Sequence, residues 1–240
     1  MNKFKLFLHS HQGETLSLNP WCVAQAQLKN SMVLSHNIWM NSIYKTVGVV
    51  GAGAMGRGIA QIAAQAGSTV KLFDTQAAAV AQATQAIGAQ WDKLAEKNRI
   101  TPEQAAQYKA QLQGASALSD LADCDLVVEA IVERLDIKKS FFAELEALVQ
   151  PTAVLVTNTS SLSVTAIAAA LKRPEQFAGY HFFNPVPLMK VVEVIAGLKT
   201  KPSICQDLAA YAKQMGHTPV QAQDTPGFIV NHAGRGYGTE

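Results

Sequence analysis

Residues 47–56, Val-Gly-Val-Val-Gly-Ala-Gly-Ala-Met-Gly, are the part of the sequence that is most informative about the fold, because they join a short apolar strand to a glycine-rich turn. Apolar residues at helical spacing follow over 59–66, and Gly67 predicts the end of that helix. In such a turn the first glycine permits the tight bend, the second admits a pyrophosphate, and the third permits close helix–strand packing. The helix N-terminus adds amide donors. We therefore expect this turn to contact a dinucleotide through Gly51, Ala52, Gly53, Ala54, Met55 and Gly56.

An acidic residue follows the second predicted strand, at 69–73. Asp74 lies 21 residues after Gly53 and can accept hydrogen bonds from an adenosine ribose. Its charge would repel a 2′-phosphate, so NAD is favoured over NADP, although Lys71 in the same strand weakens that preference slightly. The alternative is a structural glycine turn beside an ordinary surface aspartate.

Strands alternate with helices along the rest of the chain. The sequence predicts helices at 77–97, from Thr101-Pro102 onward, and at about 135–149 and 203–215. It predicts strands at 125–129, 153–157, 177–183, 191–195 and 218–221. This alternation predicts an α/β fold of the Rossmann type, a mostly parallel sheet with helices on both faces.

Composition excludes several classes of protein. The 240 residues are 48% hydrophobic and 16% charged with a net charge of +2, which gives no electrostatic case for nucleic acid or an anionic membrane. No apolar run is long enough to span a membrane. The cysteines, Cys22, Cys124 and Cys205, are far apart, which favours free thiols in a reducing compartment, and we expect the cytoplasm. No histidine or cysteine spacing suggests a metal site, so we expect no metal.

The chain divides into three parts. Residues 1–43 lack periodicity and predict a poorly ordered extension, with a targeting segment or an ordered extra strand as alternatives. Residues 44–226 form the dinucleotide-binding domain. Residues 227–240 read as the opening of a further domain that the chain does not complete.

Four later stretches carry a family resemblance. They are Asp125-Leu-Val-Val-Glu129-Ala-Ile-Val-Glu133, Asn158-Thr-Ser160-Ser161-Leu, His181-Phe-Phe-Asn184-Pro-Val-Pro and Asp224-Thr-Pro-Gly-Phe-Ile-Val-Asn231. Together with the glycine turn they closely resemble the NAD-binding N-terminal domain of the 3-hydroxyacyl-CoA dehydrogenase family, in order, over about residues 45–235. The 3-hydroxyadipyl- or 3-hydroxybutyryl-CoA type is the expected member. The resemblance implies NAD-dependent interconversion of (S)-3-hydroxyacyl-CoA and 3-oxoacyl-CoA, in the β-oxidation of fatty acids or of aromatic-derived acids such as phenylacetate.

Two residues suit the chemistry of alcohol oxidation, which needs a base for the hydroxyl proton while hydride leaves for nicotinamide. His181 ends an apolar strand, where sites gather in open parallel sheets, and histidine is the usual base at neutral pH. Glu193 lies in the next strand, beyond a turn containing Pro185 and Pro187, and could return beside the imidazole. The resemblance makes His181 and Glu193 the catalytic pair. A buried structural histidine with an unrelated glutamate is the alternative.

The resemblance also implies contacts around this pair. Ser160 and Asn184 match positions that contact substrate and nicotinamide, with local turn hydrogen bonds as the alternative. Asn231 matches a position near the catalytic pair, with a simple helix-start residue as the alternative. Glu133 and Lys138 match cofactor-contacting positions, and a solvated helix face is the alternative for Lys138.

The substrate and partner expectations rest on the resemblance as well. Lys97 and Ser160 match positions that meet the acyl-CoA substrate, although a mixed charged face around Lys97 is equally plausible and Gln90 replaces a small CoA-contacting residue. The family has a helical second domain that closes over the acyl group and forms a homodimer, and residues 227–240 match only its start. Two other functions stay open: a dehydrogenase of small 3-hydroxy acids, and a non-catalytic NAD-binding module.

Overall fold

The computed structural model describes residues 42–236, with side chains as far as residue 233. The extension predicted for residues 1–43 therefore lies outside the described residues, apart from its last two. Ser42 is buried, and its hydroxyl lies 3.1 Å from that of Ser68. The folded domain thus includes residue 42, slightly before the boundary expected from the sequence.

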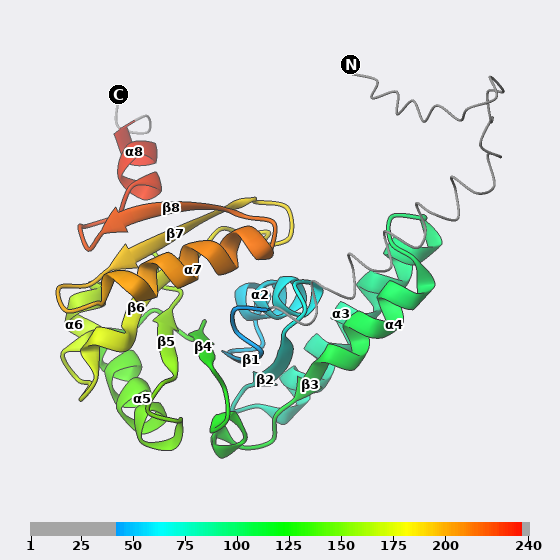
Figure 1. The fold of residues 1–240 in the computed structure, drawn as a ribbon, viewed down its shortest axis with the longest axis horizontal. Helices are drawn as coiled ribbons and strands as arrows, with labels where there is room; N and C mark the ends of the chain where they lie inside the picture. Colours follow the sequence, from blue (N-terminus) through cyan, green and yellow to red (C-terminus); the bar gives the residue numbers. More distant parts are fainter. Residues whose placement is uncertain (1–41, 237–240) are drawn as a thin grey trace, which may run out of the picture. The chain divides into compact units, whose positions relative to one another are not determined.

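An eight-stranded sheet forms the centre of the domain (Figure 1). Its order is β3-β2-β1-β4-β5-β6-β7-β8. The strands are β1 (Thr46–Val50), β2 (Thr69–Phe73), β3 (Leu112–Gly114), β4 (Leu126–Glu129), β5 (Val154–Thr157), β6 (Phe177–Phe182), β7 (Val191–Ala196) and β8 (Thr218–Gln223). The pairs from β3 to β6 are parallel, β7 is antiparallel to β6, and β8 is parallel to β7. The predicted mostly parallel Rossmann-type sheet is confirmed.

Helices cover both faces of this sheet. They are α2 (Ala54–Gln65), α3 (Ala77–Glu96), α4 (Pro102–Gln111), α5 (Leu135–Leu148), α6 (Val164–Ala168), α7 (Pro202–Gln214) and α8 (Val230–Gly236). One buried cluster packs α2, α3 and α7 against the sheet, and a second packs α5 and α6 against the other face. Strand side chains alternate between the clusters: Val49 belongs to the first and Val50 to the second. No helix within residues 42–236 has the length and apolar character needed to cross a bilayer.

Three features were not predicted. Strand β3 has three residues, too few to show a period of two. Helix α6 has five residues, and Asp224 helps to fix its start by accepting hydrogen bonds from the backbone amides of Val164 and Thr165. The antiparallel direction of β7 depends on the turn before it, and it is this direction that sets Glu193 opposite His181.

Candidate active site

The glycine turn has the geometry that its sequence predicts. Gly51 has φ +103°, and a Cβ there would lie 2.5 Å from the carbonyl oxygen of Ala130. A Cβ on Gly56 would lie 1.7 Å from the carbonyl oxygen of Gly51. A Cβ on Gly53 would meet nothing within 4 Å. The first and third glycines are therefore required by the fold, whereas Gly53 faces open space that a pyrophosphate can enter.

Asp74 ends β2 beside this turn. Its Oδ2 accepts a hydrogen bond from the backbone N–H of Ala52 at 2.8 Å, and its Oδ1 accepts one from Gln76 at 3.0 Å. It lines a cavity of about 540 Å³ that also includes Gly51, Gly53 and residues 130–132. The side chain of Lys71 instead pairs with Asp123 at 2.6 Å, so its charge is engaged there. This groove fits the adenosine half of NAD.

Changing Gly53 to alanine is expected to weaken NAD⁺ binding at least roughly tenfold and to leave the fold intact, because the added methyl group would occupy the space of the pyrophosphate. Calorimetric titration with NAD⁺ measures the first effect and thermal unfolding the second. Gly88→Ala is the matched control. It adds a methyl group on α3 at ordinary contact distance from Lys109 and should leave NAD⁺ affinity unchanged. An unchanged affinity in Gly53→Ala would show that the dinucleotide binds elsewhere.

His181 and Glu193 lie directly opposite each other in the antiparallel pair β6–β7. His181 Nδ1 and Glu193 Oε2 are 2.7 Å apart, and both residues are buried. A carboxylate only accepts hydrogen bonds, so Nδ1 carries the proton in this pair. Nε2 makes no hydrogen bond with any described residue. The contact expected from the sequence is present, and it leaves Nε2 able to accept a proton.

The first turn of α8 closes one side of this pair. Glu193 Oε1 accepts hydrogen bonds from the backbone amides of Ile229 and Val230, each at 2.9 Å. Asn231 Nδ2 donates to the carbonyl oxygen of Ser160 at 3.0 Å. Asn231 is thus more than a helix-start residue, because its amide joins α8 to the loop after β5. Glu193 is thus held by a segment far from it in the sequence, and it in turn holds His181.

Lys138 is fully buried, which makes the alternative of a solvated helix face wrong. Its Nζ lies 2.6 Å from Glu129 Oε1 and 3.4 Å from Glu133 Oε2. Glu129 also accepts hydrogen bonds from the Thr157 hydroxyl and the backbone N–H of Ile131. This buried network connects the ends of β4 and β5.

Glu133 extends the network toward Ser160. Burial raises the pKa of Glu133, but hydrogen bonds from the Thr159 hydroxyl and the Ser160 amide, together with Lys138, outweigh it and lower that pKa below its usual value. The carboxylate therefore stays ionised at neutral pH. Ser160 is exposed, and its hydroxyl lies 3.4 Å from Glu133 rather than bonded within its own turn.

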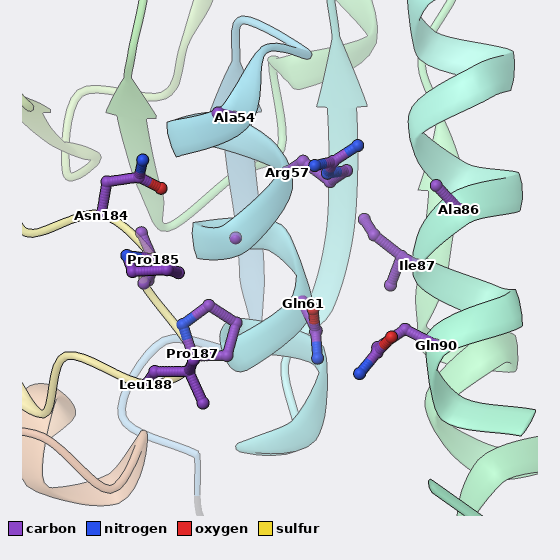
Figure 2. Close-up of a pocket in the computed structure, with 12 residues that line it drawn as sticks. Ala54, Arg57, Gln61, Ala86, Ile87, Gln90, Asn184, Pro185, Pro187 and Leu188 are labelled. Carbon is purple, nitrogen blue, oxygen red and sulfur yellow. The ribbon is translucent and has the colours of Figure 1, made fainter. Parts of the chain in front are cut away.

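Asn184 follows β6 and lines a cleft beside α2 (Figure 2). Its side chain makes no hydrogen bond with any described residue, so the alternative of local turn chemistry finds no support. Lys97 caps α3 and is exposed, and the structure does not bring it to His181. Asp92, one of the acids interleaved with the lysines of α3, pairs with Lys109 of α4.

Several residues of the site were not singled out from the sequence. Glu129 and Asp224 lie inside the quoted stretches, and each accepts a hydrogen bond from a residue distant in sequence, Thr157 for Glu129 and Val164 for Asp224. Asn158 accepts a hydrogen bond from the backbone N–H of Phe182 and so joins β5 to β6 next to His181. Burial raises the pKa of Asp224, but hydrogen bonds from Thr165, Ser163 and Val164 outweigh it and lower that pKa.

Within residues 42–236 no group of three or more histidine, cysteine or acidic side chains could hold a metal ion.

A glycine turn with a free face, an acid at the end of the second strand and a buried His–Glu pair define a nicotinamide-dinucleotide-binding domain of the dehydrogenase class. The family described as 3-hydroxyacyl-CoA dehydrogenase, NAD binding domain, matches residues 46–225. The chain belongs to this family.

Individual relatives agree with this assignment. The chain is 43% identical over 196 residues to 3-hydroxyadipyl-CoA dehydrogenase of Escherichia coli (strain K12), covering 82% of this chain and 41% of the relative. It is 41% identical to 3-hydroxybutyryl-CoA dehydrogenase of Bradyrhizobium diazoefficiens, covering 80% and 66%. A solved 3-hydroxybutyryl-CoA dehydrogenase from Escherichia coli K12 superimposes with a TM-score of 0.80 at 43% identity, covering 81% and 41%. The chain thus spans from about two fifths to two thirds of the length of these relatives.

Proposed function

We propose that this protein is an NAD-dependent oxidoreductase that interconverts (S)-3-hydroxyacyl-CoA and 3-oxoacyl-CoA. This proposal depends on the buried His181–Glu193 pair, in which Nε2 of His181 makes no hydrogen bond with any described residue. His181 lies near the carboxyl ends of the parallel strands, where the glycine turn also lies. The names of the relatives support the thioester class of substrate.

His181 acts as the general base in the direction of oxidation. Its Nε2 takes the proton of the 3-hydroxyl group, and bound NAD supplies the acceptor for the hydride that leaves the same carbon. The imidazolium that forms donates from Nδ1 to Glu193, whose charge stabilises it. In the reverse direction His181 Nε2–H returns the proton to the developing alkoxide.

The neighbouring polar groups position the reactants. The hydroxyl of Ser160 and the amide of Asn184 are exposed and can donate to the substrate oxygen or to the nicotinamide carboxamide. Asn231 positions Ser160 through the backbone carbonyl that it binds. Glu133, whose carboxylate is partly exposed, contacts the bound cofactor, and the buried Lys138 positions that carboxylate by pairing with it. Lys97 attracts phosphates of the substrate from the tip of α3.

The wider assembly is part of the same proposal. Residues 44–226 hold NAD, and two copies associate through a helical domain to which α8 belongs. The proposed substrates are thioesters of the 3-hydroxyadipyl or 3-hydroxybutyryl type. The proposed location is the cytoplasm, where Cys124 and Cys205 stay reduced.

The test follows the absorbance of NADH after acetoacetyl-CoA or free acetoacetate is added to the protein. Oxidation of NADH with the thioester and none with the free acid is expected. Faster turnover of the free acid would favour a small 3-hydroxy acid dehydrogenase. NAD binding without turnover of either compound would favour a non-catalytic module.

A further inference from the structure

The turn formed by residues 224–228 joins β8 to α8, and its first residue is fixed to the opposite side of the site. The carboxylate of Asp224 accepts hydrogen bonds from the backbone amides of Val164 at 2.9 Å and Thr165 at 2.8 Å, where α6 begins. The hydroxyl of Ser163 donates to the same carboxylate at 2.8 Å. Because α6 packs in a buried cluster against the sheet, the turn starts from a fixed point.

The last two residues of the 224–228 turn have left-handed backbone conformations. Gly227 has φ +77° and Phe228 has φ +51°. A positive φ is uncommon for a residue other than glycine, so the surrounding structure must maintain it at Phe228. The Phe228 amide donates to the carbonyl oxygen of Thr225 at 3.0 Å, and its side chain is only 4% exposed. The centroid of its ring lies 5.8 Å from that of His181, so the turn packs directly on the imidazole.

The two backbone amides that follow this turn converge on one oxygen atom. Ile229 and Val230 each donate to Glu193 Oε1 at 2.9 Å. Consecutive amides in a turn of this kind form a concave anion-binding arrangement, and here the anion is the Glu193 carboxylate. The other oxygen, Oε2, lies 2.7 Å from His181 Nδ1. Rotation of the carboxylate would break both amide hydrogen bonds, and no water could replace them because Glu193 is fully buried.

We propose that the 224–228 turn is a positioning element of the active site. It holds two backbone amides against Glu193 Oε1, and the carboxylate therefore stays directed at His181. The proposal rests on the proposed function, in which this carboxylate stabilises the imidazolium. Gly227 and Phe228 are positioning residues, since they act on the reaction through Glu193. The rate of the chemical step then depends on the backbone conformation of this turn.

Two substitutions at Gly227 separate backbone conformation from added bulk. Gly227→Asn and Gly227→Val have side chains of similar size and add the same Cβ, whose nearest neighbour would be the backbone nitrogen of His232 at 3.4 Å. Asparagine tolerates a positive φ, whereas the β-branched valine does not. Both variants of the full chain are compared with the wild type by initial-rate loss of NADH absorbance with acetoacetyl-CoA, and by calorimetric titration with NAD⁺.

Gly227→Val is expected to lower kcat by roughly 10- to 100-fold, because a small misplacement of a catalytic group can cost that much. Gly227→Asn should keep most of the wild-type kcat. NAD⁺ affinity should be the same in both variants, which excludes misfolding. When Glu193→Gln is already present, Gly227→Val should cause little further loss of kcat, because the charge that the turn positions is gone.

A second measurement does not depend on turnover. The Nδ1 proton of His181, shared with Glu193 over 2.7 Å, is expected to give a proton NMR resonance far downfield, identified by its absence in His181→Ala. This resonance should keep its position in Gly227→Asn and should move upfield or vanish in Gly227→Val.

Asp224→Asn acts on the other end of the turn and decides the question if Gly227→Val does not bind NAD⁺. It removes an acceptor for the amides of α6 and should lower kcat and shift the His181 resonance. Asp120→Asn is its matched control. Asp120 likewise accepts hydrogen bonds from two backbone amides, those of Ser116 and Ala117, but it lies outside this turn, so both readouts should stay unchanged.

An unchanged His181 resonance in a Gly227→Val protein that binds NAD⁺ would overturn the inference. Equal losses of kcat in the two Gly227 variants would overturn it as well, because added bulk would then explain them. So would a full further loss from Gly227→Val in the Glu193→Gln background. Failure of the proposed function has a different signature. A wild type that shows no turnover, with a His181 resonance that moves in Gly227→Val only, contradicts the proposed reaction and leaves the positioning of Glu193 supported.

Discussion

Changing His181 to alanine is expected to lower kcat for reduction of acetoacetyl-CoA by roughly 10²- to 10⁴-fold, the range typical of a lost general acid or base. The structure supplies the reason, because His181 Nε2 has no partner among the described residues, while Nδ1 is fixed by Glu193. The measurement is initial-rate loss of NADH absorbance at saturating NADH.

Glu193→Gln is the companion variant, because it removes the charge that stabilises the imidazolium and keeps nearly the same shape. We expect a smaller loss of kcat than in His181→Ala, together with a shift in the pH dependence of kcat. Both variants should bind NAD⁺ as the wild type does. If His181→Ala kept more than about a tenth of the wild-type kcat with normal NAD⁺ binding, His181 would not be the proton donor.

Changing Lys138 to methionine is expected to lower the free energy of unfolding by about 3–5 kcal/mol. The change would leave the carboxylate of Glu129 fully buried without its cation, which is 2.6 Å away in the wild type. Urea denaturation followed by circular dichroism measures the effect.

Lys109→Met is the matched control for this prediction. Lys109 also makes a 2.6 Å ion pair, with Asp92, but both partners are substantially exposed, so the expected loss is within about 1 kcal/mol. Equal losses in the two variants would mean that burial of the Lys138 pair adds nothing. The double variant Lys138→Met, Glu129→Gln should regain part of the lost stability, because no unpaired charge then stays buried.

The sequence predicted the elements whose signals are local. The glycine turn, the helix at 77–97 and the helix that begins after Thr101 each depend on spacing within a few residues. Thr101 and Gln104 indeed form a capping box at the start of α4. The His181–Glu193 contact could be anticipated because proline residues separate two short apolar runs.

Features that depend on residues far apart in the chain were harder to anticipate. In the sequence Lys138 is an ordinary lysine of the helix α5. Only the tertiary structure shows that its side chain contacts Glu129 instead of water. Asp224 reaches α6 across some sixty residues. The cleft lined by Arg57 and Gln61 is formed by three segments of the chain, so only the tertiary structure shows that it exists. Sequence patterns identify candidate catalytic and binding residues. The partners of buried charged side chains are determined by tertiary packing, which those patterns do not show.

A crystal structure of the protein with NAD⁺ bound would show whether the free nitrogen of His181 faces the nicotinamide ring. We expect the pyrophosphate over Gly53 and the adenosine ribose at Asp74. His181 Nε2 should point at nicotinamide C4, with room for one substrate carbon between them. A nicotinamide ring on the far side of the sheet, or an imidazole turned away from that ring, would show that His181 is not the base.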